Sequence, residues 1–262
     1  MLKELSSTNR NDKKANTAAP VQRPAALAAT IAVLQSNSLP ALVQRDLERM
    51  IVAGELPAGS KLNEAALAQM LGVSRGPIRE AFRALEESGL VRLTKNRGVF
   101  VRQVSVAEAD EIYELRAILD EYAGRKVAQT ATSANIRELQ ALVARMDDAA
   151  ARIDLDDYHR ANVEFHDLLV RLTGNAKLLQ TYRRLVNELH LYRRATLAQQ
   201  GALPVSTREH HAIVDRIAAG QPMQAGRALF EHAMGSRTRM HRVRGATAAQ
   251  LQTASSSGRT KR

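Results

Sequence analysis

The chain of 262 residues contains no cysteine and no tryptophan, and aromatic residues make up only 3% of it. Without cysteine, disulfide frameworks and thiolate chemistry are excluded, and a reducing compartment is compatible with the sequence. No apolar run approaches the roughly 18 residues that a membrane helix needs. The longest candidate, AALAATIAVL at 25–34, is too short and lacks the basic region and cleavage site of a secretory signal. We therefore expect a cytoplasmic protein that makes no membrane contact.

Leucine, alanine and arginine dominate the composition, which predicts a mainly helical fold because β-branched and aromatic residues are few. The length is sufficient for two domains of about 100 residues or slightly more each. The net charge of +11 indicates an anionic partner, although the location of the charge matters more than its size. Much of the excess lies near the ends, since residues 1–40 contribute +3 and residues 243–262 contribute +4.

Both ends of the chain have the composition of tails. Residues 1–38 are rich in Ser, Asn, Thr, Ala and Lys without a sustained apolar face, which predicts disorder. Residues 243–262 are similar, and we expect them to be disordered as well. The sequence between the tails divides into an N-terminal domain at 39–104 and a helical domain at 105–242.

Hydrophobic periodicity in the first domain predicts helices at about 40–53 and 63–71, separated by the loop GELPAGSKL. A third helix follows from Ser74, a good N-cap, to about residue 87. With this cap Pro77 falls in the first helical turn, where its missing N–H costs little. Two short strands at 90–94 and 99–104, joined by KNRG, complete the plan of a winged helix-turn-helix.

The start of the third helix is suited to double-stranded DNA. Ser74 and Arg75 stand at its N-terminal end, and Arg79 projects from the same face one turn later. The planar fork of arginine matches guanine or phosphate. Arg79 can instead form a local ion pair with Glu80. The wing that follows carries Arg97 and then Gly98, whose backbone can approach a groove closely.

A basic run crosses the predicted wing, and it has two interpretations. Arg92, Lys95, Arg97 and Arg102 lie in it without an acidic residue among them. Such a run forms either a solvated loop or a surface that faces phosphates, and charge alone does not decide between the two.

The stretch LPAGSKLNEAALAQMLGVSRGPIREAFRALEESGLVRLTKNRGVFV resembles the N-terminal domain of the GntR family of bacterial transcription regulators, over about residues 41–104. The resemblance implies base or phosphate contacts from Ser74, Arg75 and Arg79, and a wing contact around Arg97 and Gly98. Some relatives have an arginine early in the second helix, where this chain has Ala65. Asn63 or Glu64 would then substitute for it.

The second domain is predicted to be helical almost throughout. Ser105 and Glu108 have the spacing of a capping box and open its first helix. Breaks at Thr132-Ser133, Gly174-Asn175, Gly201–Pro204 and Gly220–Pro222 separate the segments. The predicted helices are at about 106–129, 133–150, 154–172, 175–197, 205–219 and 222–240, and together they predict an all-helical bundle.

Histidine is the unusual residue of this domain. Asn162 and His166 are four residues apart and share one helix face, His210 opens another helix, and His232 lies on the last. A single helical histidine is usually structural, and His159, His190 and His241 are assigned that role. Three imidazoles and one side-chain oxygen can together make a first-row transition-metal site with open positions for water or a carboxylate.

The segments ANVEFHDLLVRLTGN and REHHAIVDRIAAGQPMQAGRALFEHAM resemble the ligand-binding FCD domain of the FadR subfamily. That resemblance implies a bundle of six or seven helices and a divalent metal of the Zn, Ni or Mn class, held by Asn162, His166, His210 and His232. Asn162 is a departure, because aspartate is more usual there. Arg116 matches an arginine near the ligand cavity and can pair with an effector carboxylate or with a neighbouring helix.

These features predict a homodimeric, sequence-specific DNA-binding regulator, more often a repressor in this family, that responds to a small organic acid. Each winged helix would take one half of a near-palindromic operator. Two alternatives remain: a sensor of the metal ion itself, and a metal-dependent hydrolase or lyase. The enzyme needs a general base near the metal. Glu164 and Asp167 are rotated away from His166, and no nucleophile motif is present.

Overall fold

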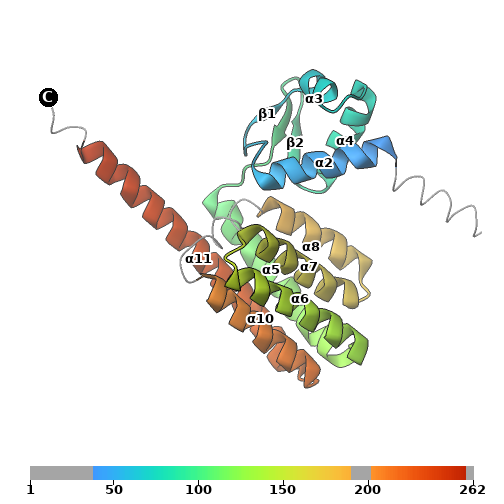
Figure 1. Cartoon of the computed structure of the whole chain (residues 1–262), viewed down its shortest axis with the longest axis vertical. Coiled ribbons are helices and arrows are strands. Elements are labelled where there is room, and N and C mark those ends of the chain that lie inside the picture. Colours follow the sequence, from blue (N-terminus) through green and yellow to red (C-terminus); the bar gives the residue numbers. More distant parts are fainter. Residues whose placement is uncertain (1–37, 190–201, 258–262) are drawn as a thin grey trace, which may run out of the picture.

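The computed structural model of the protein describes residues 38–189 and 202–257, with side chains up to residue 242 (Figure 1). The elements are α2 (Leu39–Ala53), β1 (Lys61–Leu62), α3 (Glu64–Met70), α4 (Arg75–Glu87), β2 (Val91–Thr94), β3 (Gly98–Val101), α5 (Val106–Thr130), α6 (Ser133–Ala151), α7 (Leu155–Leu172), α8 (Ala176–Glu188), α10 (Ala202–Ala218) and α11 (Pro222–Ser257). The predicted mainly helical fold, with a winged helix-turn-helix before a helical domain, is confirmed. The tail predicted at 1–38 lies outside the described residues except for Ser38.

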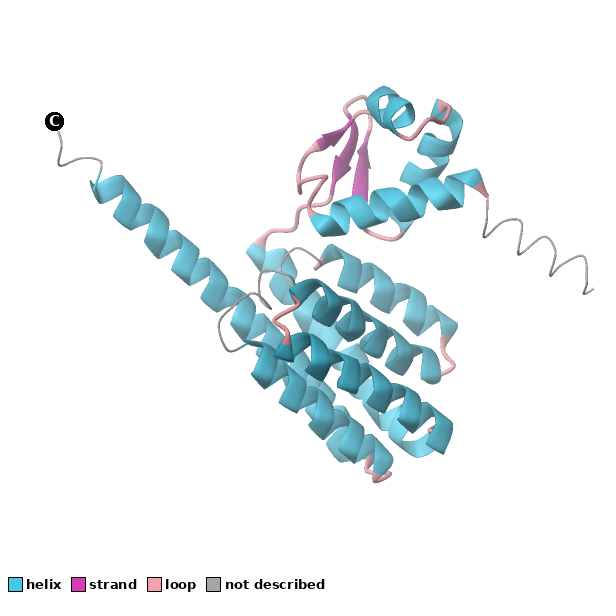
Figure 2. Cartoon of the chain, in the orientation of Figure 1, coloured by secondary structure: helices cyan, strands magenta, loops and turns pink. Residues whose placement is uncertain are grey.

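The N-terminal unit combines α2, α3 and α4 with a three-stranded antiparallel sheet of order β1-β3-β2 (Figure 2). Apolar side chains from all of these elements form its core: Val43, Leu47, Ile51, Leu62, Leu67, Ile78, Phe82, Leu85, Leu90, Val91 and Val101. The strand β1 lies inside the segment that the sequence predicted as a loop. Lys61 pairs with Phe100 and Leu62 with Val99. The strand has only two residues, too few for an alternating hydrophobic pattern to be recognised in the sequence.

The helix ends of this unit follow local chemistry. Ser38 caps α2, with its hydroxyl oxygen accepting a hydrogen bond from the Ala41 N–H at 3.3 Å. Ser74 occupies the N-cap position of α4 in an extended conformation, but its side chain makes no capping hydrogen bond. Pro77 lies in the first turn of α4, as predicted. The Ser74 hydroxyl therefore stands at an exposed helix start without a structural role in the cap.

The C-terminal unit packs α5, α6, α7, α8 and α10 with the first part of α11 (Figure 1). The long helices α5 and α11 lie against each other over much of their length. Their contact is unusually close because each contributes a glycine. A Cβ atom on Gly124 would come within 2.7 Å of Leu229 Cδ1, and one on Gly226 within 2.8 Å of the Glu121 carbonyl oxygen. Only glycine fits at this crossing.

The backbone of α11 continues as a helix to Ser257, which corrects the prediction that this helix ends near 240. The segment ATAAQLQTA explains the difference, because alanine, leucine and glutamine have high helix propensity and no Gly or Pro follows until Gly258. Composition alone had suggested a tail. Figure 1 shows this part of the helix projecting beyond the bundle.

The two units meet where the end of α4 faces the end of α8. The Asn187 side-chain amide donates a hydrogen bond of 2.9 Å to the carbonyl of Ser88, the residue that caps α4. Gly89 follows with φ of 81°, and a Cβ there would lie 3.0 Å from Glu188 Cγ. The end of α4 is thus held against one helix of the bundle. Within the described residues, no helix is long and apolar enough to cross a membrane.

Replacing Gly124 by alanine tests the close crossing. We expect a loss of about 1–2 kcal/mol in the free energy of unfolding, because overpacking costs about 1–3 kcal/mol and the helix-propensity gain offsets at most about 1 kcal/mol of it. Urea unfolding followed by circular dichroism measures the change. The matched control is Gly235→Ala on α11, where the nearest atom to a new Cβ is 3.4 Å away. Equal stability of the two variants would contradict a crossing this tight.

Candidate nucleic-acid interface and metal centre

The exposed start of α4 brings together the residues that the sequence singled out. Ser74 and Arg75 are both exposed, and Arg79 follows one turn later on the same face. Ile78, Phe82 and Leu85 are buried on the opposite face. Among the described residues Arg75 forms no ion pair, so its guanidinium is available to an anionic partner. The helix also presents its N-terminal backbone N–H groups here, which favour phosphate.

Arg79 has a structural partner that the sequence did not predict. Its Nε lies 2.8 Å from Glu64 Oε2 on α3, while its side chain remains 62% exposed. The local pair with Glu80 that the sequence allowed is replaced by this contact. An exposed ion pair of this kind is weak, worth about 0.2–1 kcal/mol. It pre-orients Arg79 along the surface of the two helices without removing it from solvent.

Asn63 and Glu64 begin the second helix of this unit. The side-chain oxygen of Asn63 accepts hydrogen bonds from the N–H groups of Ala65 and Ala66 at 3.0 and 3.1 Å. This cap commits the oxygen, so a contact with DNA would come from the Asn63 side-chain amide nitrogen. Glu64 is an unsuitable substitute for a phosphate contact because it is acidic and already binds Arg79.

The wing is a tight hairpin between β2 and β3. Arg97 is exposed, and its backbone N–H closes the turn onto the Thr94 carbonyl at 3.0 Å. Gly98 has φ of 105°, a conformation that side chains rarely adopt, and a Cβ there would lie 3.1 Å from Lys61 Cε. Lys61 therefore stands beside the wing, placed there by the pairing of β1 with β3. Sequence reasoning missed this cation because the strand that positions it was not foreseen.

Arg102 does not belong to the basic surface, although the sequence grouped it with the wing cations. Its guanidinium is bound to Glu108 at the start of α5 and lies 3.4 Å from Glu188 at the end of α8. Its side chain is only 26% exposed. The two carboxylates neutralise it at the junction of the two units, so the phosphate-facing interpretation is wrong for this residue.

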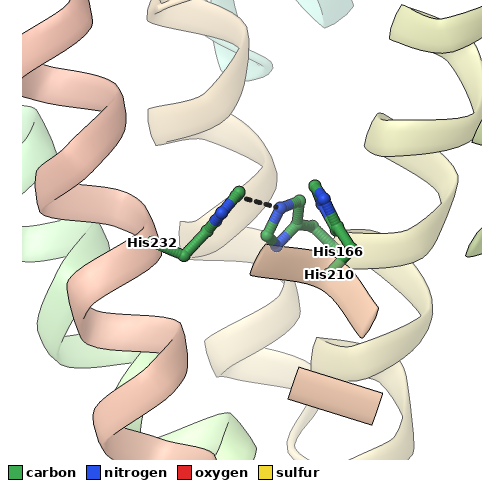
Figure 3. Close-up of side chains that lie close together, drawn as sticks. All are labelled: His166, His210 and His232. Atoms are coloured by element: carbon green, nitrogen blue, oxygen red, sulfur yellow. Dashed lines mark hydrogen bonds between the residues drawn. The ribbon is translucent and has the colours of Figure 1, made fainter. Parts of the chain in front are cut away.

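The three histidines selected from the sequence converge inside the helical bundle (Figure 3). His166 on α7, His210 on α10 and His232 on α11 are all buried, and one ring nitrogen of each lies within 4.8 Å of the others. His166 Nε2 and His232 Nε2 are 3.2 Å apart. Ligand nitrogens about 2.0–2.1 Å from a tetrahedral zinc lie about 3.3 Å from one another. The spacing of these two imidazoles fits a metal ion of that size.

Hydrogen bonds on the far side of two rings direct their Nε2 lone pairs to the centre. His210 Nδ1 is 2.6 Å from the Ser206 carbonyl oxygen, and His232 Nδ1 is 2.8 Å from Glu209 Oε2. Each acceptor requires the proton on Nδ1, which leaves Nε2 unprotonated. Partners of this kind set the tautomer and orientation of metal-binding imidazoles. Burial lowers the pKa of His232 despite Glu209, so its neutral form is favoured.

Arg116 determines which nitrogen of the third imidazole, His166, carries the proton. Its guanidinium can only donate, and it lies 3.3 Å from His166 Nε2. His166 Nε2 is therefore an acceptor in this contact, and His232 Nε2 is also unprotonated because the His232 proton lies on Nδ1, toward Glu209. Two nitrogen lone pairs then face each other across 3.2 Å. This arrangement is unfavourable unless a proton or a cation lies between them.

Glu209 links the cluster to the last helix. Arg239 binds it in a two-point contact, with N–O distances of 2.9 and 3.0 Å. Burial works against the charge, but the hydrogen bonds from His232 and Arg239 lower the pKa of Glu209 to about 2. The Glu209 carboxylate is consequently ionised at neutral pH. The sequence offered one signal for this role of Glu209, namely that it directly precedes His210.

Arg116 is itself held by Asp120 and Tyr182. Its Nε lies 3.1 Å from Asp120 Oδ2 and 3.1 Å from the Tyr182 hydroxyl, and its side chain is 1% exposed. Burial opposes the charge, yet Tyr182 and Asp120 keep the pKa of the guanidinium above its ordinary value. Asp120 Oδ1 is also 3.8 Å from His166 Nδ1. The role of Asp120 was not predicted from the sequence. The only signal for its ion pair with Arg116 was the i,i+4 spacing of the two residues.

Asn162 is buried on the same face of α7, one turn before His166. A neutral amide there leaves the cluster without a carboxylate at that position. His211, next to His210 in the sequence, points away from the cluster, and its Nε2 lies 2.9 Å from Asp147 at the surface. His241 Nε2 similarly contacts Asp110 at 2.7 Å. His190 lies outside the described residues.

The two carboxylates that the sequence offered as a general base are engaged elsewhere. Glu164 binds Arg145 at 2.8 Å, and Asp167 binds Arg183 at 2.5 Å. Each of these arginines meets its carboxylate at a partly exposed position. Neither acidic residue faces the histidine cluster, in agreement with the rotation that the sequence predicted.

Two family models match the chain. Residues 41–101 match the model "Bacterial regulatory proteins, gntR family", and residues 111–234 match the FCD domain. The "Probable D-xylose utilization operon transcriptional repressor" of Paenarthrobacter nicotinovorans is 32% identical over 182 residues, which cover 70% of this chain and 80% of the relative. YdhC, a helix-turn-helix-type transcriptional regulator of Bacillus subtilis, is 30% identical over 65% of this chain and 77% of its own length.

A solved structure is also similar. A GntR transcriptional regulator from a Rhodococcus species is 27% identical in sequence with a TM-score of 0.65, over 78% of this chain and 98% of that one. The matched families and these relatives are transcription regulators, so the metal-dependent enzyme considered from the sequence is rejected.

Zinc titration of single histidine variants tests the cluster. We expect His210→Ala to weaken zinc binding by about 100-fold or more, because it removes one of three convergent nitrogens. His211→Ala, one residue later and turned to the surface, is the matched control and should bind zinc as the unchanged protein does. Competition with a chromophoric chelator measures both affinities. Similar zinc affinities for the two variants would contradict a metal site at the cluster.

Proposed function

The chain belongs to the GntR family of bacterial regulatory proteins and is a DNA-binding transcription regulator, and from this premise we propose a more specific function. It acts in the cytoplasm as a homodimeric repressor whose affinity for its operator is set by a small organic acid. The acid binds beside a divalent metal of the Zn, Ni or Mn class in the helical domain. Relatives described as repressors of sugar-acid and sugar operons support the direction of control.

The DNA contacts are assigned to the exposed start of α4 and to the wing. Arg75 and Arg79 would reach base edges or phosphates from α4, with Ser74 at the helix start beside them. Arg97 and the Gly98 backbone would contact the groove from the wing. Asn63 would add a contact through its amide nitrogen. Lys61 adds a cation beside the wing, where its ammonium suits a phosphate.

One observation carries the metal assignment: two imidazole nitrogens face each other at 3.2 Å, and both act as acceptors, since Arg116 donates to His166 Nε2 and the His232 proton lies on Nδ1 toward Glu209. His166, His210 and His232 would hold the ion, and Asn162 would offer its amide oxygen. A bound divalent ion supplies a Lewis-acidic position for a ligand oxygen. The chain has no carboxylate at position 162 to balance the charge of the ion. An anionic effector carboxylate beside Arg116 would provide the missing negative charge.

Helix α8 connects this site to the DNA-binding unit. The Tyr182 hydroxyl on α8 accepts a hydrogen bond from Arg116. Asn187, near the end of the same helix, holds the Ser88 carbonyl that caps α4. An acid that draws Arg116 toward itself would change the contact with Tyr182 and hence favour a different placement of α8. Differential affinity of the acid for the two placements provides the coupling to DNA.

A sensor of the metal ion itself is the second candidate. The buried, convergent imidazoles favour it, because they form a site that needs no organic ligand. The two candidates differ in one measurement. If zinc alone releases the operator at saturating metal and organic acids have no further effect, the metal is the effector.

Substituting Arg75 by alanine tests the DNA assignment. We expect operator affinity to fall about 10- to 100-fold, since a bidentate base contact contributes about 1–3 kcal/mol of discrimination. The operator is first selected from a random DNA pool with the unchanged protein, and affinity is measured by fluorescence anisotropy. Arg227→Ala, whose side chain is 80% exposed on α11, is the control and should bind normally. An unchanged footprint for Arg75→Ala would exclude it from the interface.

Asn162→Asp tests the proposed role of the effector charge. An added carboxylate should tighten zinc binding by about 10-fold and weaken the affinity of the zinc-loaded protein for citrate, the probe acid, by a similar factor. Calorimetry with zinc and then with citrate measures both steps. Asn135→Asp, on the exposed capping turn of α6, should change neither. If the variant binds zinc more tightly but citrate equally well, the acid does not supply the missing charge.

A further inference from the structure

A cleft lies between helix α2 of the N-terminal unit and helices α6, α7 and α8 of the bundle. Two adjoining cavities form it, of about 650 and 220 Å³, and both are lined by Glu48, Val163, Glu164 and Asn187. Figure 1 shows α2 next to the side of the bundle that carries α8. None of the three clustered histidines lines either cavity. The cleft is therefore separate from the metal centre, and its walls belong to both units of the chain.

The smaller cavity combines three valines with polar and charged side chains. Val52 of α2, Val163 of α7 and Val186 of α8 supply the apolar wall. The remaining lining residues are Glu48, His159, Arg160, Glu164 and Asn187. An apolar wall with a few polar groups is the usual composition of a ligand site, and the volume lies below the roughly 300–1,000 Å³ that drug-sized ligands occupy. The cavity therefore suits a small molecule with an apolar body.

Glu48 is the acidic residue of the cleft that has no basic partner. The other acidic lining residues are each paired with an arginine: Glu138 with Arg171, Glu164 with Arg145, and Asp167 with Arg183. Arg160, the remaining lining arginine, pairs with Asp157. Within the described ranges 38–189 and 202–242, the side chain of Glu48 forms neither an ion pair nor a hydrogen bond.

The position of Glu48 makes its negative charge unfavourable. The side chain is half-buried where the two units meet. Burial raises the pKa of Glu48, and the charge of Arg183 opposes that shift only in part. A carboxylate that is withdrawn from water without a bonded partner gains from a cation placed beside it. Every arginine of the cleft already has a carboxylate partner, so the charge balance favours a cationic ligand over an anion or a zwitterion.

We propose that this cleft is a second ligand site, which binds a small organic ammonium ion. The ammonium donates hydrogen bonds to Glu48, and the apolar body of the ligand packs on the three valines. Because the walls come from both units, the ligand binds most tightly to one placement of α2 against the bundle. Its affinity is then linked reciprocally to the affinity for the operator. The inference goes beyond the proposed function, since it needs neither the metal nor the organic acid.

Isoamylammonium is the probe, because it joins one ammonium group to a short branched apolar chain. Glu48→Gln should raise its dissociation constant about 10-fold or more, since a hydrogen bond to a charged group is lost. Titration of the full chain at pH 7, followed by ligand-observed NMR, measures the affinity. Asp46→Asn, on the same helix but outside the cleft and paired with Arg49, is the matched control and should bind normally.

Isoamyl alcohol has the same apolar chain without the charge and should bind about 10-fold more weakly than the ammonium. Thermal unfolding checks the fold of Glu48→Gln, whose stability should not fall because burial disfavours the carboxylate that it removes. Equal affinities of the unchanged protein and Glu48→Gln for the ammonium would overturn the proposal. Equal affinities of the ammonium and the alcohol, or no saturable binding to the unchanged protein, would overturn it as well.

Two further variants locate the site. Val163→Phe places a larger side chain in the wall of both cavities and should weaken binding of the probe about 10-fold or more. His210→Ala should bind the probe as the unchanged protein does, because the cleft does not include the histidine cluster. Loss of binding in His210→Ala with retention in Glu48→Gln would place the probe at the metal centre and overturn the proposal.

Operator binding tests the linkage. Saturating isoamylammonium chloride should change the operator affinity of the unchanged protein about 3-fold or more, measured against sodium chloride at the same concentration because DNA binding falls with salt. Glu48→Gln should lose this response. His210→Ala should keep it, so that failure of the metal assignment is distinguishable from failure of the cleft. Saturable binding of the probe without a change in operator affinity would overturn the linkage.

Discussion

The positive charge of Arg116 is the constraint around which the helical domain is organised. A guanidinium that is 1% exposed would be prohibitively costly unless its donors were satisfied. Asp120, Tyr182 and His166 satisfy them from three helices. Because guanidinium only donates, it also decides which nitrogen of His166 carries a proton. The same charge therefore stabilises the packing and prepares the ring for a cation.

Local signals were sufficient to predict most elements from the sequence. The proline at 77 and the glycine at 98 belong to short-range chemistry, and the structure places both as expected. Ser74 also occupies the predicted N-cap position, although its side chain makes no capping hydrogen bond. The convergence of His166, His210 and His232 was also predicted, although from a family resemblance together with helix-face spacing. Spacing alone contains no information on distances between helices.

The features that were missed depend on contacts far apart in the chain. The strand β1 exists only through its pairing with β3, and Lys61 reaches the wing for that reason. The sequence groups Arg102 with the basic wing. In the structure its guanidinium lies against Glu188, which is 86 residues later in the chain. The end of α11 was mispredicted from its local composition, not because a long-range contact was missed. Its composition resembled a tail, whereas its alanine-rich propensity favours helix.

The close crossing of α5 and α11 has a mechanical consequence. Because a Cβ on Gly124 or on Gly226 would lie 2.8 Å from a carbonyl oxygen of the opposite helix, neither helix can slide past the other without a clash. The two helices must therefore shift as one rigid pair. Arg116 belongs to one member of that pair and His232 to the other, so their separation is preserved in any such shift. Any relative movement at the cluster must therefore come from α7 and α10. These two helices carry His166 and His210, which would move against Arg116 and His232.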